Sequence, residues 1–245
     1  MALEVFKQAQ AERNFFMAFA GMAWIVVLIG FYPSVAGRMR GEADYPAPLI
    51  LELHVAAVSA WLILLSGQVA LIRTRRIQLH RRIGMTLAAL IPMIVITGIG
   101  AEVYSQRFFS PRYPENLRFF IAPLLEMLGF AIAALLAWKK RHESAAHKRL
   151  IVVATAILLV APFARWWGEP LYQLVGDGFA GMVVHNFAGP DLLVALAAGF
   201  DRWKFGKVHR VFVVSLFALL VGEVMASAIY HSAAWPGVVR MMVGI

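Results

Sequence analysis

Long apolar runs separated by short polar turns make up almost the whole chain. Each run holds about 20 residues, the length that an α-helix needs to cross roughly 30 Å of hydrocarbon. Open strand edges would leave backbone groups unpaired in lipid, so we expect the runs to be helices. The pattern predicts seven spans, at residues 15–35, 48–72, 83–104, 117–138, 149–167, 180–200 and 210–231. The expected fold is therefore an all-α, seven-transmembrane-helix bundle that forms one domain over residues 1–245.

Basic residues are concentrated in three turns, which follow the second, fourth and sixth spans. More than half of the 23 lysines and arginines lie there. Because such turns stay on the cytoplasmic side, the N-terminus is expected inside and the C-terminus outside. Residues 1–14 would then be a short cytoplasmic segment, and we expect the first span to be retained rather than cleaved as a signal peptide.

Composition supports lipid as the solvent and main partner. The chain is 61% hydrophobic and 15% charged, whereas soluble domains are near half apolar and a quarter charged. The net charge of +9 is divided into blocks between apolar runs, which argues against nucleic acid as a partner. The chain has no cysteine. Any metal or cofactor would therefore be held by histidine, carboxylate or methionine.

Four ionisable side chains lie at similar depths in their spans, although such side chains cost about 2.5–3.5 kcal/mol at mid-helix. Their depths below the predicted outer ends are roughly 9–14 Å at 1.5 Å per residue. They are His54, Glu126, His185 and Glu223. Together they would suit a divalent metal such as zinc or iron, with Glu126 and Glu223 as the candidate catalytic carboxylates. Asp191 and Arg165 lie near the same level and are candidates to join them.

The alternative is that each of these side chains only hydrogen-bonds to a neighbouring helix and stabilises packing. Depth along a helix does not determine which face of the helix a side chain occupies. A second set of histidines begins the spans on the cytoplasmic side: His80, His147 and His209, each followed by Arg or Lys. Neutral imidazole binds haem iron and other metals, but a partly solvated interfacial histidine is equally compatible with these positions.

Part of the chain resembles the ascorbate-reducible transmembrane b-type cytochromes. The matching residues are His54, Gln68, the motif His80-x-x-x-Gly84, and Thr97-Gly98. The resemblance covers about two of the seven spans. It implies two b-type haems, one near each membrane face, each held by histidines from two helices, with His80 and His147 as the inner pair. The fourth span departs from that pattern, since it carries Glu126 and no histidine in its outer half, so an outer haem would need His185 beside His54.

A second resemblance covers most of the chain. Residues 31–34 (Phe-Tyr-Pro-Ser), the His80 turn, residues 146–150 (Ala-His-Lys-Arg-Leu) and Arg165-Trp166 are similar to a group of bacterial multi-span inner-membrane proteins of unassigned function. This resemblance implies a multi-pass protein of the bacterial inner membrane. It implies no particular chemistry.

Three hypotheses for function remain open at this point. The first is electron transfer through b-type haem bound by His54, His80, His147 and His185, with a redox partner. The second is a non-haem metal enzyme that uses the histidines and glutamates near the outer face. The third is a cofactor-free transporter, proton pathway or assembly partner of another membrane subunit, in which Glu126 and Glu223 exchange protons.

Overall fold

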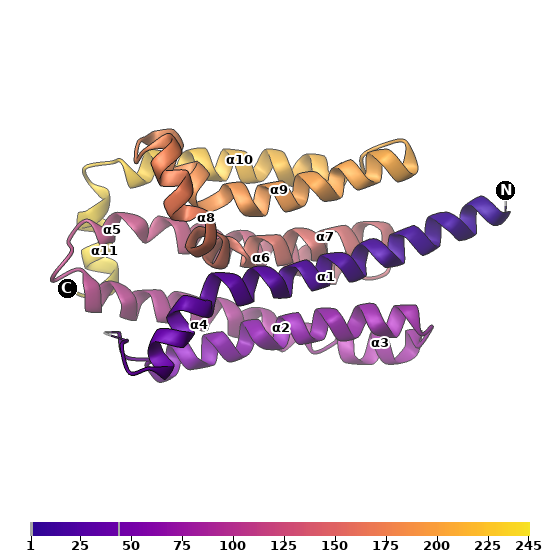
Figure 1. The fold of residues 1–245 in the computed structure, drawn as a ribbon, viewed down its shortest axis with the longest axis horizontal. Coiled ribbons are helices and arrows are strands. Elements are labelled where there is room, and N and C mark those ends of the chain that lie inside the picture. The colour runs from indigo at the N-terminus through magenta and orange to yellow at the C-terminus, as the bar shows by residue number, and fades with distance from the viewer. Residues whose placement is uncertain (1, 44) are drawn as a thin grey trace.

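The computed structural model describes residues 2–43 and 45–245, which form helices joined by short turns, without strands (Figure 1). The elements are α1 (Ala2–Met39), α2 (Leu49–Arg73), α3 (Ile77–Gly84), α4 (Leu87–Phe109), α5 (Asn116–Phe119), α6 (Ile121–Lys139), α7 (Ser144–Leu158), α8 (Val160–Val175), α9 (Phe179–Phe205), α10 (Arg210–Tyr230) and α11 (Trp235–Val243). Six helical segments are long and apolar enough to cross a membrane, and the α7–α8 pair gives a seventh if it is one bent span. The predicted all-helical, multi-span membrane architecture is confirmed.

The long helices run side by side along the longest axis of the molecule (Figure 1). The N-terminus lies at the same end as the α2–α3 and α9–α10 turns, and the C-terminus lies at the other end. We call the first of these the basic end, because the three turns rich in Lys and Arg lie there. The placement of the basic end in the cytoplasm stays a prediction from charge.

The fifth predicted span is broken rather than straight. α7 and α8 meet at Leu159 with a bend of 52°, and Pro162 lies in the first turn of α8. Proline has no N–H to donate to the carbonyl four residues earlier, and its ring clashes with that carbonyl. The helix therefore ends at Leu158 and restarts in a new direction, which tilts α8 across the bundle (Figure 1).

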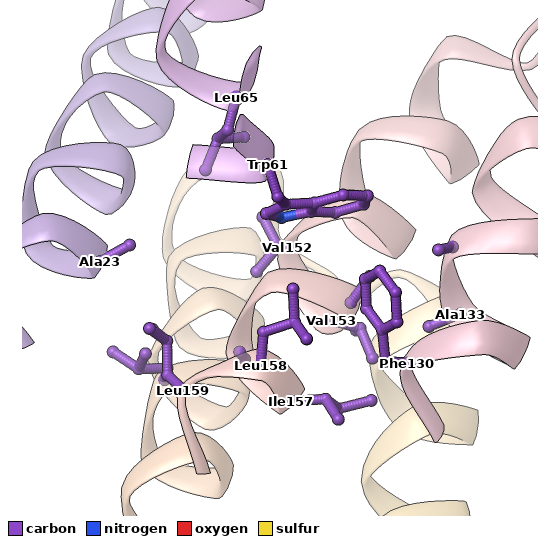
Figure 2. Packing of buried hydrophobic residues seen from close by; sticks show 14 of the residues in the cluster. Ala23, Trp61, Leu65, Phe130, Ala133, Val152, Val153, Ile157, Leu158 and Leu159 are labelled. Atoms are coloured by element: carbon purple, nitrogen blue, oxygen red, sulfur yellow. The ribbon is translucent and has the colours of Figure 1, made fainter. Parts of the chain in front are cut away.

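One core of buried side chains joins eight of the helices, and α2, α6 and α7 contribute its centre (Figure 2). The ring of Trp61 meets the ring of Phe130 edge to face, with centroids 5.0 Å apart. The Trp61 indole N–H also donates to the hydroxyl of Thr155 at 3.0 Å. A buried indole needs such a partner, so this bond fixes α2 against α7.

The outer surface of the bundle carries large apolar side chains. Phe217 on α10 is 70% exposed and Leu28 on α1 is 63% exposed, as expected for side chains that face lipid. Small residues occur instead where helices touch. A Cβ on Gly30 would lie 2.3 Å from the carbonyl oxygen of Pro162, so only glycine permits this contact between α1 and α8.

The last helix, α11, was not predicted from hydropathy. It is short, and Val239 and Val243 on it pack against Leu117 and Phe120 near the start of the fourth span. The Trp235 indole N–H donates to the backbone carbonyl of Arg118 at 3.2 Å. These contacts cover the end of the bundle opposite the basic end.

A buried ion pair ties α7 to α9 near the basic end. The guanidinium of Arg149 donates two hydrogen bonds to the two carboxylate oxygens of Asp201, each at 2.7 Å. The two side chains are 9% and 5% exposed. The backbone N–H of His209 also donates to Asp201 at 3.2 Å, so the same carboxylate positions the start of α10.

We predict that Asp201→Asn lowers the free energy of unfolding by about 3–5 kcal/mol, because it leaves the Arg149 charge buried without its partner. Thermal unfolding of the detergent-purified protein measures this. Arg40→Gln is the matched control, since the pair that Arg40 forms with Glu42 is 59% exposed on both sides and such pairs contribute about 0–1 kcal/mol. Equal effects of the two substitutions would contradict the prediction.

Candidate functional site

Four helical segments form a ring around the part of the bundle that contains most of the predicted site residues. α2 packs against α4, α4 against α6, and α6 against α7, and the Trp61–Thr155 hydrogen bond joins α7 back to α2. Going round the ring from helix to helix, α4 and α7 lie opposite each other. α3 leads directly into α4. His80 on α3 and His147 on α7 therefore approach the basic end of the ring from opposite sides.

The imidazole of His147 is oriented by the backbone. Its Nδ1 lies 2.8 Å from the carbonyl oxygen of Ala137. A carbonyl only accepts hydrogen bonds, so Nδ1 must carry the proton. In the neutral ring this leaves the Nε2 lone pair free to bind a ligand.

His80 lies close enough to His147 for their charges to interact. The ring of His80 lies near the backbone of Gln68, and its Nδ1 is buried without a partner among the described residues. The imidazole of His147 has its Nδ1 engaged by a backbone carbonyl, and its Nε2 has no hydrogen-bond partner among the described residues.

Two further side chains at this level have buried polar atoms without partners. They are Gln68, with both its amide oxygen and its amide nitrogen, and Trp138, with its indole nitrogen. With His80, they account for four of the eight such atoms found in the part of the chain that the structure describes. We call Gln68, His80, Trp138 and His147 the basic-end cluster. An unpaired buried polar group costs about 1–3 kcal/mol, so this concentration points to a bound partner.

Gly84 lies one helical turn beyond His80. The position that its Cβ would take has only one neighbour within 4 Å, the amide oxygen of Gln68 at 3.9 Å. Residues at i and i+4 share a helix face, so the glycine keeps space free beside the His80 ring. The His80-x-x-x-Gly84 spacing found in the sequence therefore has a structural counterpart.

His54 lies toward the opposite end of the ring and is tightly packed. Its Nδ1 is 3.2 Å from the hydroxyl oxygen of Thr97, which donates its own proton to the carbonyl of Met93 at 2.6 Å. A Cβ on Gly98 would lie 2.9 Å from the His54 ring and 2.6 Å from the sulfur of Met127. Thr97 and Gly98 thus hold the imidazole in place.

Glu126 belongs to a charged group near His54. It is 8% exposed, and its charge interacts with those of Arg165 on α8 and Glu102 on α4. Glu102 accepts a hydrogen bond from the side-chain amide of Gln106 at 2.6 Å. Glu102 was missed in the sequence analysis, although its place inside the third predicted span was a usable signal.

Glu223 and His185 lie elsewhere, on the α9–α10 side of the bundle. The carboxyl group of Glu223, which is 2% exposed, lies close enough to that of Asp191 for their charges to interact, and its Oε2 is buried with no hydrogen-bond partner among the described residues. His185 lies beside the ring of Tyr172, with centroids 5.5 Å apart. The Glu223 and Glu126 groups are separated by a helix contact, in which a Cβ on Gly222 would meet Leu125 at 3.0 Å.

The structure therefore does not bring together the four proposed metal ligands, His54, Glu126, His185 and Glu223. Over the described residues, no group of three or more His, Asp or Glu side chains is arranged to hold a metal ion. The sequence predicts that these four side chains share a depth in the membrane. Side chains at one depth can still point away from one another. His209, the third inner histidine, caps α10 and takes no part in the basic-end cluster.

Comparison of the chain with family models, with curated proteins and with solved structures gives no match. The interpretation of the site therefore depends on its own geometry.

We predict that Arg165→Gln lowers the midpoint of thermal unfolding by about 2–4 °C or more, equivalent to at least about 1 kcal/mol. Arg165 is the cation whose charge acts on both Glu126 and Glu102, and its loss removes a favourable charge from beside these two carboxylates. Adding Glu126→Gln to this variant should recover part of the loss. Arg240→Gln, which changes an exposed side chain on α11, is the control. No recovery in the double variant would show that the three side chains are not coupled.

Proposed function

We propose that this multi-span membrane protein binds one b-type haem at its basic end, between His80 and His147, and transfers electrons there. The observation that supports the proposal is the pair of imidazoles from opposite places in the helix ring, close enough for their charges to interact, each with a ring nitrogen that has no hydrogen-bond partner among the described residues. His80 and His147 would hold the haem iron through these nitrogens, because imidazole is a common ligand of haem iron. When bound, the haem would supply one-electron redox chemistry.

The side chains of the basic-end cluster suit this ligand. The hydrogen bond from His147 Nδ1 to Ala137 is of the kind that orients a metal-binding histidine and strengthens its other nitrogen as a donor. Gln68 and Trp138 offer unused N–H groups to a polar edge of the ligand. Arg81 and Arg82 follow His80 and are exposed. They can therefore compensate the charge of the haem carboxylate groups at the membrane surface.

The proposal is for one haem and not two. His54 has Thr97 as its hydrogen-bond partner, and Gly98 and Met127 pack against its ring. The side chain at the corresponding level of α6 is Glu126, which is associated with Arg165. His185 lies beside Tyr172, away from this group. A single haem near one face would exchange electrons with a partner on that face.

Haem-replete expression followed by absorption spectroscopy of the detergent-purified protein tests this. We predict a Soret band with about one haem per chain, and a loss of at least about tenfold in haem affinity for His80→Ala and for His147→Ala, because each removes one of the two donors. His142→Ala, in the exposed α6–α7 turn, and His54→Ala should keep the band. Circular dichroism checks that each variant is folded. Wild-type protein without a Soret band would refute the proposal.

A second candidate function is proton exchange at the Asp191–Glu223 pair. Two neighbouring carboxylates repel each other unless one of them holds a proton. This pair lies inside the membrane-spanning region, where ionisable side chains commonly form proton pathways. It supports the cofactor-free alternative, with Glu223 in the role expected from the sequence and Asp191 as its partner.

We predict that infrared difference spectra recorded across a pH change contain a carboxyl C=O signal that Glu223→Gln and Asp191→Asn each remove. The exposed Glu169→Gln is the control. Proton uptake into proteoliposomes should fall in the same two variants and survive in His80→Ala, which separates this function from haem binding. A signal that persists in both carboxyl variants would exclude the pair as its source.

A further inference from the structure

A cavity separate from the basic-end cluster lies between the end of α6, the start of α7 and the start of α10. Its volume is about 550 Å³. Its polar lining consists of Lys140, Glu143, Ser144, His209, Arg210 and Ser215. It also belongs to the basic end, because the turns on both sides of it carry lysines and arginines.

Arg210 supplies the uncompensated charge of this cavity. Lys140 also lines it, but Lys140 is paired with Glu143 at 2.7 Å. Among the contacts of the described residues, the Arg210 guanidinium has neither an ion pair nor a hydrogen bond. A cation without a partner at the rim of a cavity favours an anionic occupant.

His209 adds a hydrogen-bond donor. Its Nδ1 accepts from the backbone N–H of Val211 at 3.2 Å. Burial, with nearby Arg149 acting in the same direction, lowers the pKa of His209 below the usual value of histidine, so the neutral ring is favoured. With Nδ1 accepting, the neutral ring carries its proton on Nε2 and can donate from there. The hydroxyl groups of Ser144 and Ser215 offer two further donors.

The N-terminal turns of two helices contribute to the same cavity. Ser144 begins α7, and Arg210 begins α10. Helix N-termini carry partial positive charge. The Arg149–Asp201 pair, through the backbone of His209, fixes the position of the second of them. The donors are therefore held in place before any ligand binds.

The remaining wall of the cavity is apolar and continuous with the lipid-facing surface. Leu136, Leu150 and Val214 line it, and Leu136 and Val214 are 42% and 64% exposed. Val214, Phe217 and Val221 are spaced along one face of α10, and all three are exposed. A ligand whose polar end lies at Arg210 would thus have an apolar surface for a chain directed into the membrane.

We propose that this cavity binds the phosphate headgroup of an anionic phospholipid, with an acyl chain along the exposed face of α10. The charge at Arg210 selects the anion, and the apolar wall selects a lipid over a soluble phosphate. Bound in this way, the lipid would link the α6–α7 turn to the start of α10. It would therefore stabilise the bundle at the basic end.

Native mass spectrometry and thermal unfolding of the detergent-purified protein test the proposal with three probes: phosphatidylglycerol, phosphatidylcholine with the same acyl chains, and inorganic phosphate. Phosphatidylglycerol should bind and raise the unfolding midpoint, and the other two should have little effect. Arg210→Gln should weaken phosphatidylglycerol binding by about fivefold, the effect of one basic residue near an anionic surface. Lys207→Gln removes a charge from the same turn outside the cavity, and should change binding less than twofold.

Ser215→Leu fills the cavity without changing its charge. It provides a second test of lipid binding if Arg210→Gln does not fold. It should also weaken phosphatidylglycerol binding. Equal binding of the two lipids, or unchanged binding in both cavity variants, would overturn the proposal. Stabilisation by inorganic phosphate that depends on Arg210 would also overturn it, because the site would then serve a soluble anion. All arms are measured without haem, so their outcome is independent of haem binding.

Discussion

Hydrocarbon offers no hydrogen bonds, so every polar side chain inside the bundle must find its partner within the protein or in a ligand. Most of these side chains do so in this structure. The Trp61 indole bonds to Thr155, His54 bonds to Thr97, and Arg149 bonds twice to Asp201. Each of these contacts joins two different helices. The polar residues that cost most on insertion are therefore also the ones that set the helix positions.

The two ends of the bundle meet this requirement differently. Away from the basic end, ionisable groups interact with one another: Glu126 and Glu102 with Arg165, and Asp191 with Glu223. The unpartnered polar atoms there, on Gln106, Ser110, His185 and Glu223, are single atoms on separate side chains. At the basic end, the polar atoms of Gln68 and Trp138 and Nδ1 of His80 have no partner among the described residues. A ligand site needs polar groups of this kind, which have no hydrogen-bond partner until the ligand binds.

Hydropathy was enough to predict the helices, because the length of an apolar run is set by the thickness of the membrane. It did not predict the break at Leu159, where Pro162 interrupts the hydrogen-bond ladder inside a run that is apolar throughout. It also did not predict α11, whose nine residues are too few to span. Both exceptions depend on local backbone geometry rather than on average polarity.

The candidate site was predicted only in part, for a related reason. Counting residues from a helix end gives depth, and on that basis the sequence predicts His80 and His147 at one level. Which way a side chain points depends on the rotation of each helix about its axis, and the neighbouring helices set that rotation. Glu126 and Glu223 illustrate this, because each belongs to a different charged group on either side of the Leu125–Gly222 contact. Glu102 was overlooked because it lies two residues from the end of its predicted span.

The start of α7 connects the separate features of the basic end. Within six residues it carries Ser144, which lines the cavity, His147, which belongs to the basic-end cluster, and Arg149, which pairs with Asp201. At about 100° per residue, these three side chains leave the helix in different directions. The ion pair is the most buried of the three contacts and holds α7 against α9. Because a helix rotates about its axis only as a whole, that one contact also determines where the His147 imidazole and the Ser144 hydroxyl point.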